Sequence, residues 1–331
     1  MARAIVFNRD GYDTFIDFLK AYSIVMVVIA HTLPQVVQDY TLFALWGGMQ
    51  VPVYILIQVF HAYKRGARPR WHHGRMIGRI LIPFLAVQAL ILAVLILRGM
   101  PVDELLSTSL QAGGYGPGSY FIWVYLQMAL LLVLLFPWVK GRRTGVLFAV
   151  FLGASILMEI LCSLTDMPEW LYRILAVRYL FLIPLGVQWV RKGIVMSARS
   201  IVLSAASMAA VVFFSFTEAD LEPWFFNTGW RTHRWICYYY VAALLPFALH
   251  GLFRLFQKSA CLSALTRGIA KISYEVFLAQ MAVFSLFPMS RLQWIGKYSV
   301  RLTAWVVLAL LMSLAGGWML WRLRTWINGE K

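Results

Sequence analysis

The stretch FIDFLKAYSIVMVVIAHTL, residues 15–33, is long and apolar enough to cross a membrane as one helix, yet it carries three ionisable side chains. Lys20 precedes His31 by eleven residues, so in an α-helix the two side chains lie about 20° apart around the axis and about 16 Å apart along it. Asp17 lies three residues before Lys20, on a neighbouring part of the same face. Because ionisable groups are costly at membrane depth, this face suggests a functional site. The structural alternative is an interfacial ion pair of Asp17 with Lys20, with His31 capping the far end.

The composition predicts that the whole chain is a membrane protein. Of its 331 residues, 61% are hydrophobic and only 13% are charged, and the mean hydropathy is +0.72. Soluble domains carry about a quarter charged residues. We therefore expect an all-α, polytopic membrane protein in which residues 1–331 form a single transmembrane domain. Ten segments are near the ~20 residues that a helix needs to cross the hydrocarbon core, and they cover residues 15–34, 42–62, 76–97, 119–139, 144–164, 172–190, 199–217, 235–256, 268–289 and 300–321.

The distribution of charge predicts the orientation of these spans. The net charge is +16. Loops after the even-numbered spans and the C-terminal tail hold most of the Lys and Arg residues, whereas the other loops hold most of the acids. This asymmetry assigns both termini to the cytoplasm. Because the basic residues lie in short loops between apolar segments, we expect contacts with membrane lipids and no nucleic-acid partner. The longest predicted external segment, residues 218–234, is a candidate cover for the outer mouth.

Further charged residues lie within or beside the predicted spans. Glu159 and Arg178 fall towards the outer half, where they could pair with each other or face a cavity with His31. A structural ion pair and a catalytic role are both open for them. Arg75 and Arg79 are four residues apart, hence on one helix face at the cytoplasmic mouth of the third span. They are either a clamp for phosphate or topological charges whose side chains reach the interface.

Two polar residues lie in the ninth span, in ISYEVFLAQ (residues 272–280). Glu275 and Gln280 are candidates for substrate binding, although an amide in a helix interface more often joins helices. No metal site is expected, because the three cysteines are few and far apart. They are Cys162, Cys237 and Cys261.

Four stretches resemble motifs of the acyltransferase 3 family of integral membrane acyltransferases. In the most specific one, a basic residue precedes a histidine by eleven positions, here Lys20 and His31. Many members have Arg at the first position, and Lys20 keeps the charge but lacks the guanidinium fork. The stretches are IDFLKAYSIVMVVIAHT (16–32), VPVYILIQVFHAYKRG (51–66), GRMIGRILIPF (74–84) and ISYEVFLAQ (272–280), with a weaker fifth match in GPGSYFIWVYLQMALLLVLLFP (116–137).

The chain departs from the family pattern in two places. Gln58 and Val59 stand where Ser-Gly is usual in the second motif, and Gln280 stands where the late motif often ends in His. Gln280 does not titrate, so this chain has no second titrating group at that position.

The resemblance implies about ten helices and the transfer of an acyl group, usually acetyl, from a cytoplasmic acyl-coenzyme A. The acceptor would be a hydroxyl of a glycan or lipid-linked sugar at the outer side of a bacterial inner membrane. Acyl-coenzyme A is then a donor substrate, and no permanently bound cofactor is expected.

Roles for the site residues follow from this chemistry. Cations at the cytoplasmic mouth, Arg75, Arg79 and Lys20, would bind the coenzyme A phosphates. His31 would act as general base or carry the acyl group as a covalent relay. The other candidates would position these groups: Asp17 would orient Lys20, and Glu159 or Arg178 would orient His31 or stabilise the oxyanion.

The main alternative is a transporter or flippase for a lipid-linked sugar or small anion, in which buried charges are also common. Two features disfavour it. The sequence shows no repeat between its halves of the kind that many transporters have. The charges of the spans also lie mostly at helix ends.

Overall fold

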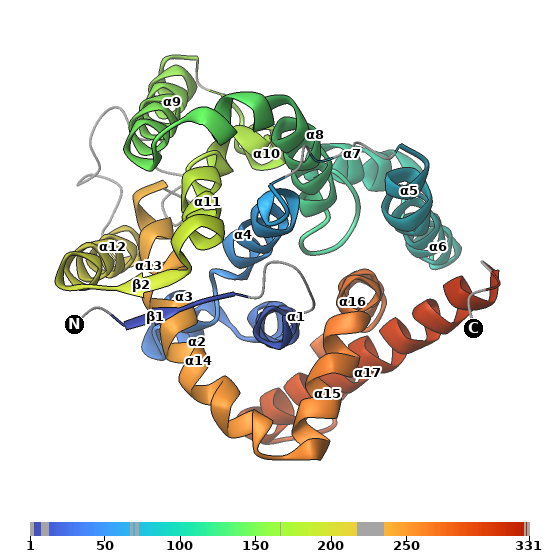
Figure 1. Ribbon diagram of the computed structural model, residues 1–331. Coiled ribbons are helices and arrows are strands. Elements are labelled where there is room, and N and C mark those ends of the chain that lie inside the picture. Colours follow the sequence, from blue (N-terminus) through green and yellow to red (C-terminus); the bar gives the residue numbers. More distant parts are fainter. Residues whose placement is uncertain are drawn as a thin grey trace.

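The computed structural model describes residues 3–7, 13–66, 69, 73–165, 167–216, 235–327 and 329. Almost all of this part is helical, and a two-stranded sheet is its only strand structure among the described residues (Figure 1). The elements are β1 (Arg3–Ile5), α1 (Thr14–Thr32), α2 (Gln35–Tyr40), α3 (Phe43–Trp46), α4 (Gln50–Tyr63), α5 (His73–Met76), the π-helical turn η1 (Ile77–Leu81), α6 (Ile82–Leu97), α7 (Val102–Ala112), α8 (Tyr120–Gly141), α9 (Thr144–Leu164), α10 (Glu169–Ile174), the 3₁₀ turn η2 (Ala176–Tyr179), α11 (Leu182–Lys192), β2 (Ile194–Met196), α12 (Ala198–Phe216), η5 (Trp235–Cys237), α13 (Tyr238–Ala242), α14 (Leu244–Gln257), α15 (Ala260–Lys271), α16 (Ser273–Leu286), η6 (Met289–Leu292) and α17 (Tyr298–Ile327).

The described residues include seven helical segments that are long and apolar enough to cross a membrane. An eighth is obtained if α15 and α16, which meet at a bend of 71°, count as one span. The prediction of an all-α, multi-pass membrane protein is therefore confirmed, while the count of ten and the cytoplasmic location of the termini stay predictions. The seven are Thr14–Thr32, Phe43–Tyr63, Ile77–Leu97, Tyr120–Gly141, Thr144–Cys162, Tyr238–Gln257 and Tyr298–Ile327. The predicted external segment 218–234 lies outside the described residues.

The predicted span 172–190 is not one helix, because the chain breaks at Leu175, which is extended. Gln127 of α8 satisfies the backbone groups that the break leaves free. Its amide donates to the Ile174 carbonyl at 2.9 Å and its oxygen accepts from the Ala176 N–H at 3.2 Å. Inside a membrane protein a broken helix is tolerated when other groups satisfy its backbone in this way. Gln127 thus stabilises the turn between α10 and η2.

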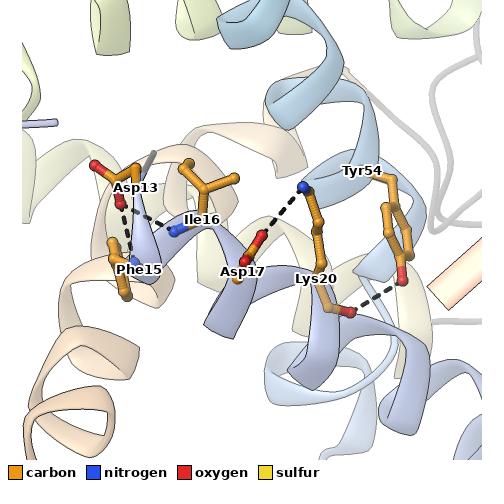
Figure 2. Close-up of polar contacts among 6 residues, drawn as sticks. All are labelled: Asp13, Phe15, Ile16, Asp17, Lys20 and Tyr54. Carbon is orange, nitrogen blue, oxygen red and sulfur yellow. Dashed lines mark hydrogen bonds and ion pairs between the residues drawn. The ribbon is translucent and has the colours of Figure 1, made fainter. Parts of the chain in front are cut away.

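Helix α1 lies near the centre of the bundle, between α4 on one side and α14, α15 and α16 on the others (Figure 1). Asp13 caps its first turn and accepts hydrogen bonds from the N–H groups of Phe15 at 2.9 Å and Ile16 at 3.2 Å (Figure 2). A side-chain cap of this kind satisfies backbone donors that a helix start leaves free. Helix α1 is thus capped at its start and packed against several other helices.

The sheet joins the start of the chain to the loop that follows α11. Strand β1 pairs antiparallel with β2, with Arg3 opposite Met196 and Ile5 opposite Ile194. Residues 3–5 and 194–196 consequently lie at the same end of the bundle, which is what the predicted topology requires.

Gly317 allows α17 to pack directly on α16. A Cβ at this position would lie 2.5 Å from Val276 Cγ2 and 2.7 Å from the Val276 backbone nitrogen. Small residues at such positions let membrane helices approach closely. We expect Gly317→Val to separate the two helices and lower the free energy of unfolding by about 1–3 kcal/mol.

The measurement is the unfolding midpoint in detergent. Gly153→Val of α9 is the matched control, since no atom lies within 4 Å of the position of its added Cβ. Equal midpoints for the two variants would contradict the prediction.

Candidate active site

A cavity of about 820 Å³ lies beside the polar face of α1. Three residues singled out from the sequence line it, namely Lys20, His31 and Arg79. Lys20 and His31, eleven residues apart on one helix, therefore face the same space. Helices α4, α8 and α16 supply most of the remaining wall. The volume falls within the range of about 300–1,000 Å³ typical of small-molecule sites.

One end of the cavity, called here the basic end, is formed by Lys20, His61, Arg79 and Arg324. Helix α4 brings His61 near Lys20, close enough for the charge of Lys20 to act on the imidazole. Arg79 and Arg324 both interact with Glu275 at the start of α16. Under the predicted topology this end faces the cytoplasm.

The opposite end, called the histidine end, is formed by His31 and Arg173. The imidazole packs edge-on against the ring of Phe284, with 5.9 Å between ring centroids. Arg173 of α10 is close enough for its charge to act on His31, and its guanidinium lies over the ring of Tyr120 at 5.2 Å. An imidazole and a cation thus meet where the cavity ends.

Lys20 is held on both sides at the basic end (Figure 2). Its ammonium lies 3.3 Å from Asp17 Oδ1, and its backbone carbonyl accepts a hydrogen bond from the Tyr54 hydroxyl at 3.0 Å. Asp17 is buried, whereas Lys20 is partly exposed to the cavity. The pair expected from the sequence is therefore present, and the role of Asp17 as orienter of a ligand-binding amine stays a prediction.

Of the two arginines of the third family motif, Arg75 and Arg79, the structure describes the side chain of Arg79. Arg79 lies in the π-helical turn η1 and is exposed to the cavity. Arg75 belongs to α5, and its side chain lies outside the described part of the structure. The wider turn of a π-helix is frequent at functional sites, and here it lies where the third span meets the cavity.

Glu159 and Arg178 lie behind the cavity wall, and neither is among the described residues that line it. Glu159 is buried and accepts a hydrogen bond from the Tyr172 hydroxyl at 2.5 Å. The guanidinium of Arg178, only 3% exposed, lies over the rings of Tyr179 at 4.7 Å, Tyr172 at 5.3 Å and Tyr120 at 5.9 Å. Such cation–π contacts stabilise a desolvated cation. The structure therefore brings these two residues together through Tyr172 and separates them from His31.

Gln280 tethers the glycine-rich segment that closes part of the cavity. Its amide donates to the Pro117 carbonyl at 3.3 Å, and Pro117 and Gly118 line the cavity. Gln88 of α6 binds the same segment, donating to the Tyr115 carbonyl at 3.0 Å and accepting from the Tyr115 N–H at 2.5 Å. Gly118 has φ +81°, a left-handed conformation that favours glycine. Gln280 thus contacts the wall of the cavity rather than its interior.

The sequence analysis did not single out as site residues two arginines and a histidine that line the cavity. Arg324 was indistinguishable from the other basic residues of the C-terminal tail, and Arg173 lies in a short helix inside a segment expected to be a continuous span. For His61 one signal existed, because it lies within the stretch 51–66 that resembles the second family motif.

A family model described as an acyltransferase domain matches residues 13–322, nearly the whole chain. The match begins at the residue that caps α1, includes Lys20, His31, Arg79 and Arg173, and ends two residues before Arg324. No curated protein and no solved structure matches the chain.

Proposed function

Because the chain belongs to the acyltransferase 3 family, we propose that it moves an acyl group, acetyl in the simplest case, from a cytoplasmic acyl-coenzyme A to a sugar hydroxyl. The acceptor is a cell-surface glycan or lipid-linked sugar at the outer side of a bacterial inner membrane. The observation that carries the proposal is that one cavity is lined by Lys20, Arg79 and Arg324 at its basic end and by His31, with Arg173, at its histidine end. These are the groups that a phosphorylated thioester donor and its acceptor require.

The donor binds with its nucleotide at the basic end. Coenzyme A carries several phosphates, and Arg79 and Lys20 offer charge-assisted hydrogen bonds to them. Arg75, four residues before Arg79, is the third candidate for this role. The slender pantetheine arm then extends along α1, over the ~16 Å that separate Lys20 from His31, and presents the thioester carbonyl to the imidazole.

His31 serves the transfer in one of two ways. As general base it takes the proton of the acceptor hydroxyl while that oxygen attacks the thioester carbonyl; the tetrahedral intermediate collapses, and the departing thiolate of coenzyme A receives the proton. As covalent relay an imidazole nitrogen attacks the carbonyl and expels the thiol, and the acyl-imidazole then passes its acyl group to the hydroxyl. Both routes develop negative charge on the carbonyl oxygen.

Arg173 is the cation best located to stabilise this oxyanion, since it lines the cavity beside His31. We expect Arg173→Ala to lower kcat by about 100-fold, in the range found when one oxyanion donor is removed. Donor affinity should stay unchanged because Arg173 lies at the end opposite the phosphates. Arg199→Ala, an exposed arginine of α12, is the control. An unchanged kcat for Arg173→Ala would remove Arg173 from the mechanism.

The function is tested with purified protein in liposomes and labelled acetyl-coenzyme A. An acyltransferase releases free thiol and labels the acceptor glycan, whereas a flippase moves the lipid-linked sugar across the bilayer without releasing thiol. Mass spectrometry of surface glycan from cells with and without the protein identifies the acceptor. Absence of any acyl difference together with absence of thiol release would refute the acyltransferase proposal.

A further inference from the structure

Arg324, near the end of the long helix α17, forms part of the basic end of the cavity. It makes an ion pair with Glu275 of α16. The side chain of Glu275 is 5% exposed and that of Arg324 is 24% exposed, so the carboxylate is enclosed while the guanidinium reaches the cavity. The pair therefore joins the last helix of the chain to the wall of the proposed donor site.

The ion pair leaves part of the guanidinium unused. Its contact with Glu275 is through Nη1, and Nε has no hydrogen-bond partner among the residues that the structure describes. A guanidinium presents several N–H donors in a planar fork that matches a phosphate group. Because Nε is itself buried, the donors that Arg324 offers to a ligand are those of the partly exposed remainder of the guanidinium, which lines the cavity.

Glu275 fixes where that fork points. A buried ion pair adds little stability compared with apolar packing, so its presence is better explained by orientation than by stability. Arg79 also acts on this carboxylate electrostatically. Two arginines from separate elements, Arg79 of η1 and Arg324 of α17, thus act on one carboxylate, and both line the basic end of the cavity.

We propose that Arg324 is a phosphate-binding residue for the nucleotide end of the acyl-coenzyme A donor, with Glu275 as its positioning residue. The inference rests on the proposed function and adds a ligand contact from the last helix of the chain. The same chemistry would suit the phosphate of a lipid headgroup, which the experiment distinguishes.

The experiment measures donor affinity by calorimetry on the full-length protein in phosphatidylcholine nanodiscs. For Arg324→Ala we expect acetyl-coenzyme A to bind about 10- to 100-fold more weakly, the effect of losing one charge-assisted hydrogen bond. S-acetylpantetheine has no phosphate, so loss of a phosphate contact should not affect its binding. Its affinities for the variant and the unaltered protein should agree within about twofold. Arg322→Ala is the matched control, since Arg322 lies over the rings of Trp318 and Trp321.

Two further variants separate ligand binding from architecture. The double variant Glu275→Arg with Arg324→Glu restores an ion pair, so a structural role predicts recovery of affinity and a phosphate-binding role predicts continued loss. In Glu275→Gln the guanidinium of Arg324 is no longer oriented by an ion pair. Acetyl-coenzyme A should therefore bind this variant more weakly, while the affinity for S-acetylpantetheine should stay unchanged.

Several results would overturn the inference. The first is an unchanged affinity of Arg324→Ala for acetyl-coenzyme A, and the second is equal weakening of acetyl-coenzyme A and S-acetylpantetheine. The third is recovery of affinity in the double variant. The fourth comes from repeating the measurement in phosphatidylglycerol nanodiscs: a loss of affinity seen only there would assign Arg324 to lipid binding. Failure of the unaltered protein to bind acetyl-coenzyme A would instead overturn the proposed function itself.

Discussion

His31→Ala is expected to abolish acyl transfer while membrane insertion and donor affinity persist. Loss of a general base costs about 100- to 10,000-fold in rate, and loss of a covalent carrier removes that route entirely. Donor affinity is expected to persist because the cations proposed to bind the phosphates line the basic end of the cavity. The measurement is thiol release with acceptor present, alongside calorimetry with acetyl-coenzyme A.

His250→Ala is the matched control for this variant. His250 also lies on a predicted membrane-spanning helix, but its ring packs against Phe15 and Phe253 and is not among the described residues that line the cavity. Full activity in His31→Ala would exclude the imidazole from the mechanism. Rapid quenching separates the two routes in the unaltered protein, since only the covalent relay leaves acyl label on His31.

The second large effect is expected for the double variant Arg75→Ala with Arg79→Ala. Each arginine can offer a charge-assisted hydrogen bond to phosphate, worth about 1.5–3 kcal/mol, so acyl-coenzyme A should bind at least about 100-fold more weakly. Calorimetry with acetyl-coenzyme A measures the change. Arg142→Ala with Arg143→Ala removes the same charge from another predicted cytoplasmic loop and should leave affinity unchanged. If the two double variants bind the donor alike, Arg75 and Arg79 serve topology alone.

The part of the site that lies on one helix could be predicted from the sequence. The angle and distance between Lys20 and His31 depend only on the helical geometry of α1. In the structure both residues line the same cavity. The proximity of Asp17 to Lys20 is equally local, and it appears as the pair at 3.3 Å. Arg79 was a candidate from its spacing to Arg75 and from the family resemblance, but its place in the same cavity as Lys20 depends on tertiary packing.

The rest of the site depends on tertiary packing that no local pattern encodes. Glu159 and Arg178 both contact Tyr172, the first through a hydrogen bond and the second over its ring, and neither is among the described residues that line the cavity. Arg173 reaches the cavity because the chain breaks at Leu175, and the groups freed there are satisfied by Gln127, which is 47 to 49 residues away in sequence. A hydropathy profile of residues 172–190 indicates an apolar segment and does not locate the break at Leu175.

The two ends of the cavity also set a minimum reach for any donor. A molecule anchored by its charge beside Lys20 delivers its reactive carbon to His31 only if a flexible tether of about three turns of helix joins the two parts. A compact activated acid such as acetyl phosphate is too short to touch both, so it gains no help from the cations when it reacts. Chain length, as well as charge, thereby becomes a criterion by which this enzyme discriminates between activated acyl compounds in the cell.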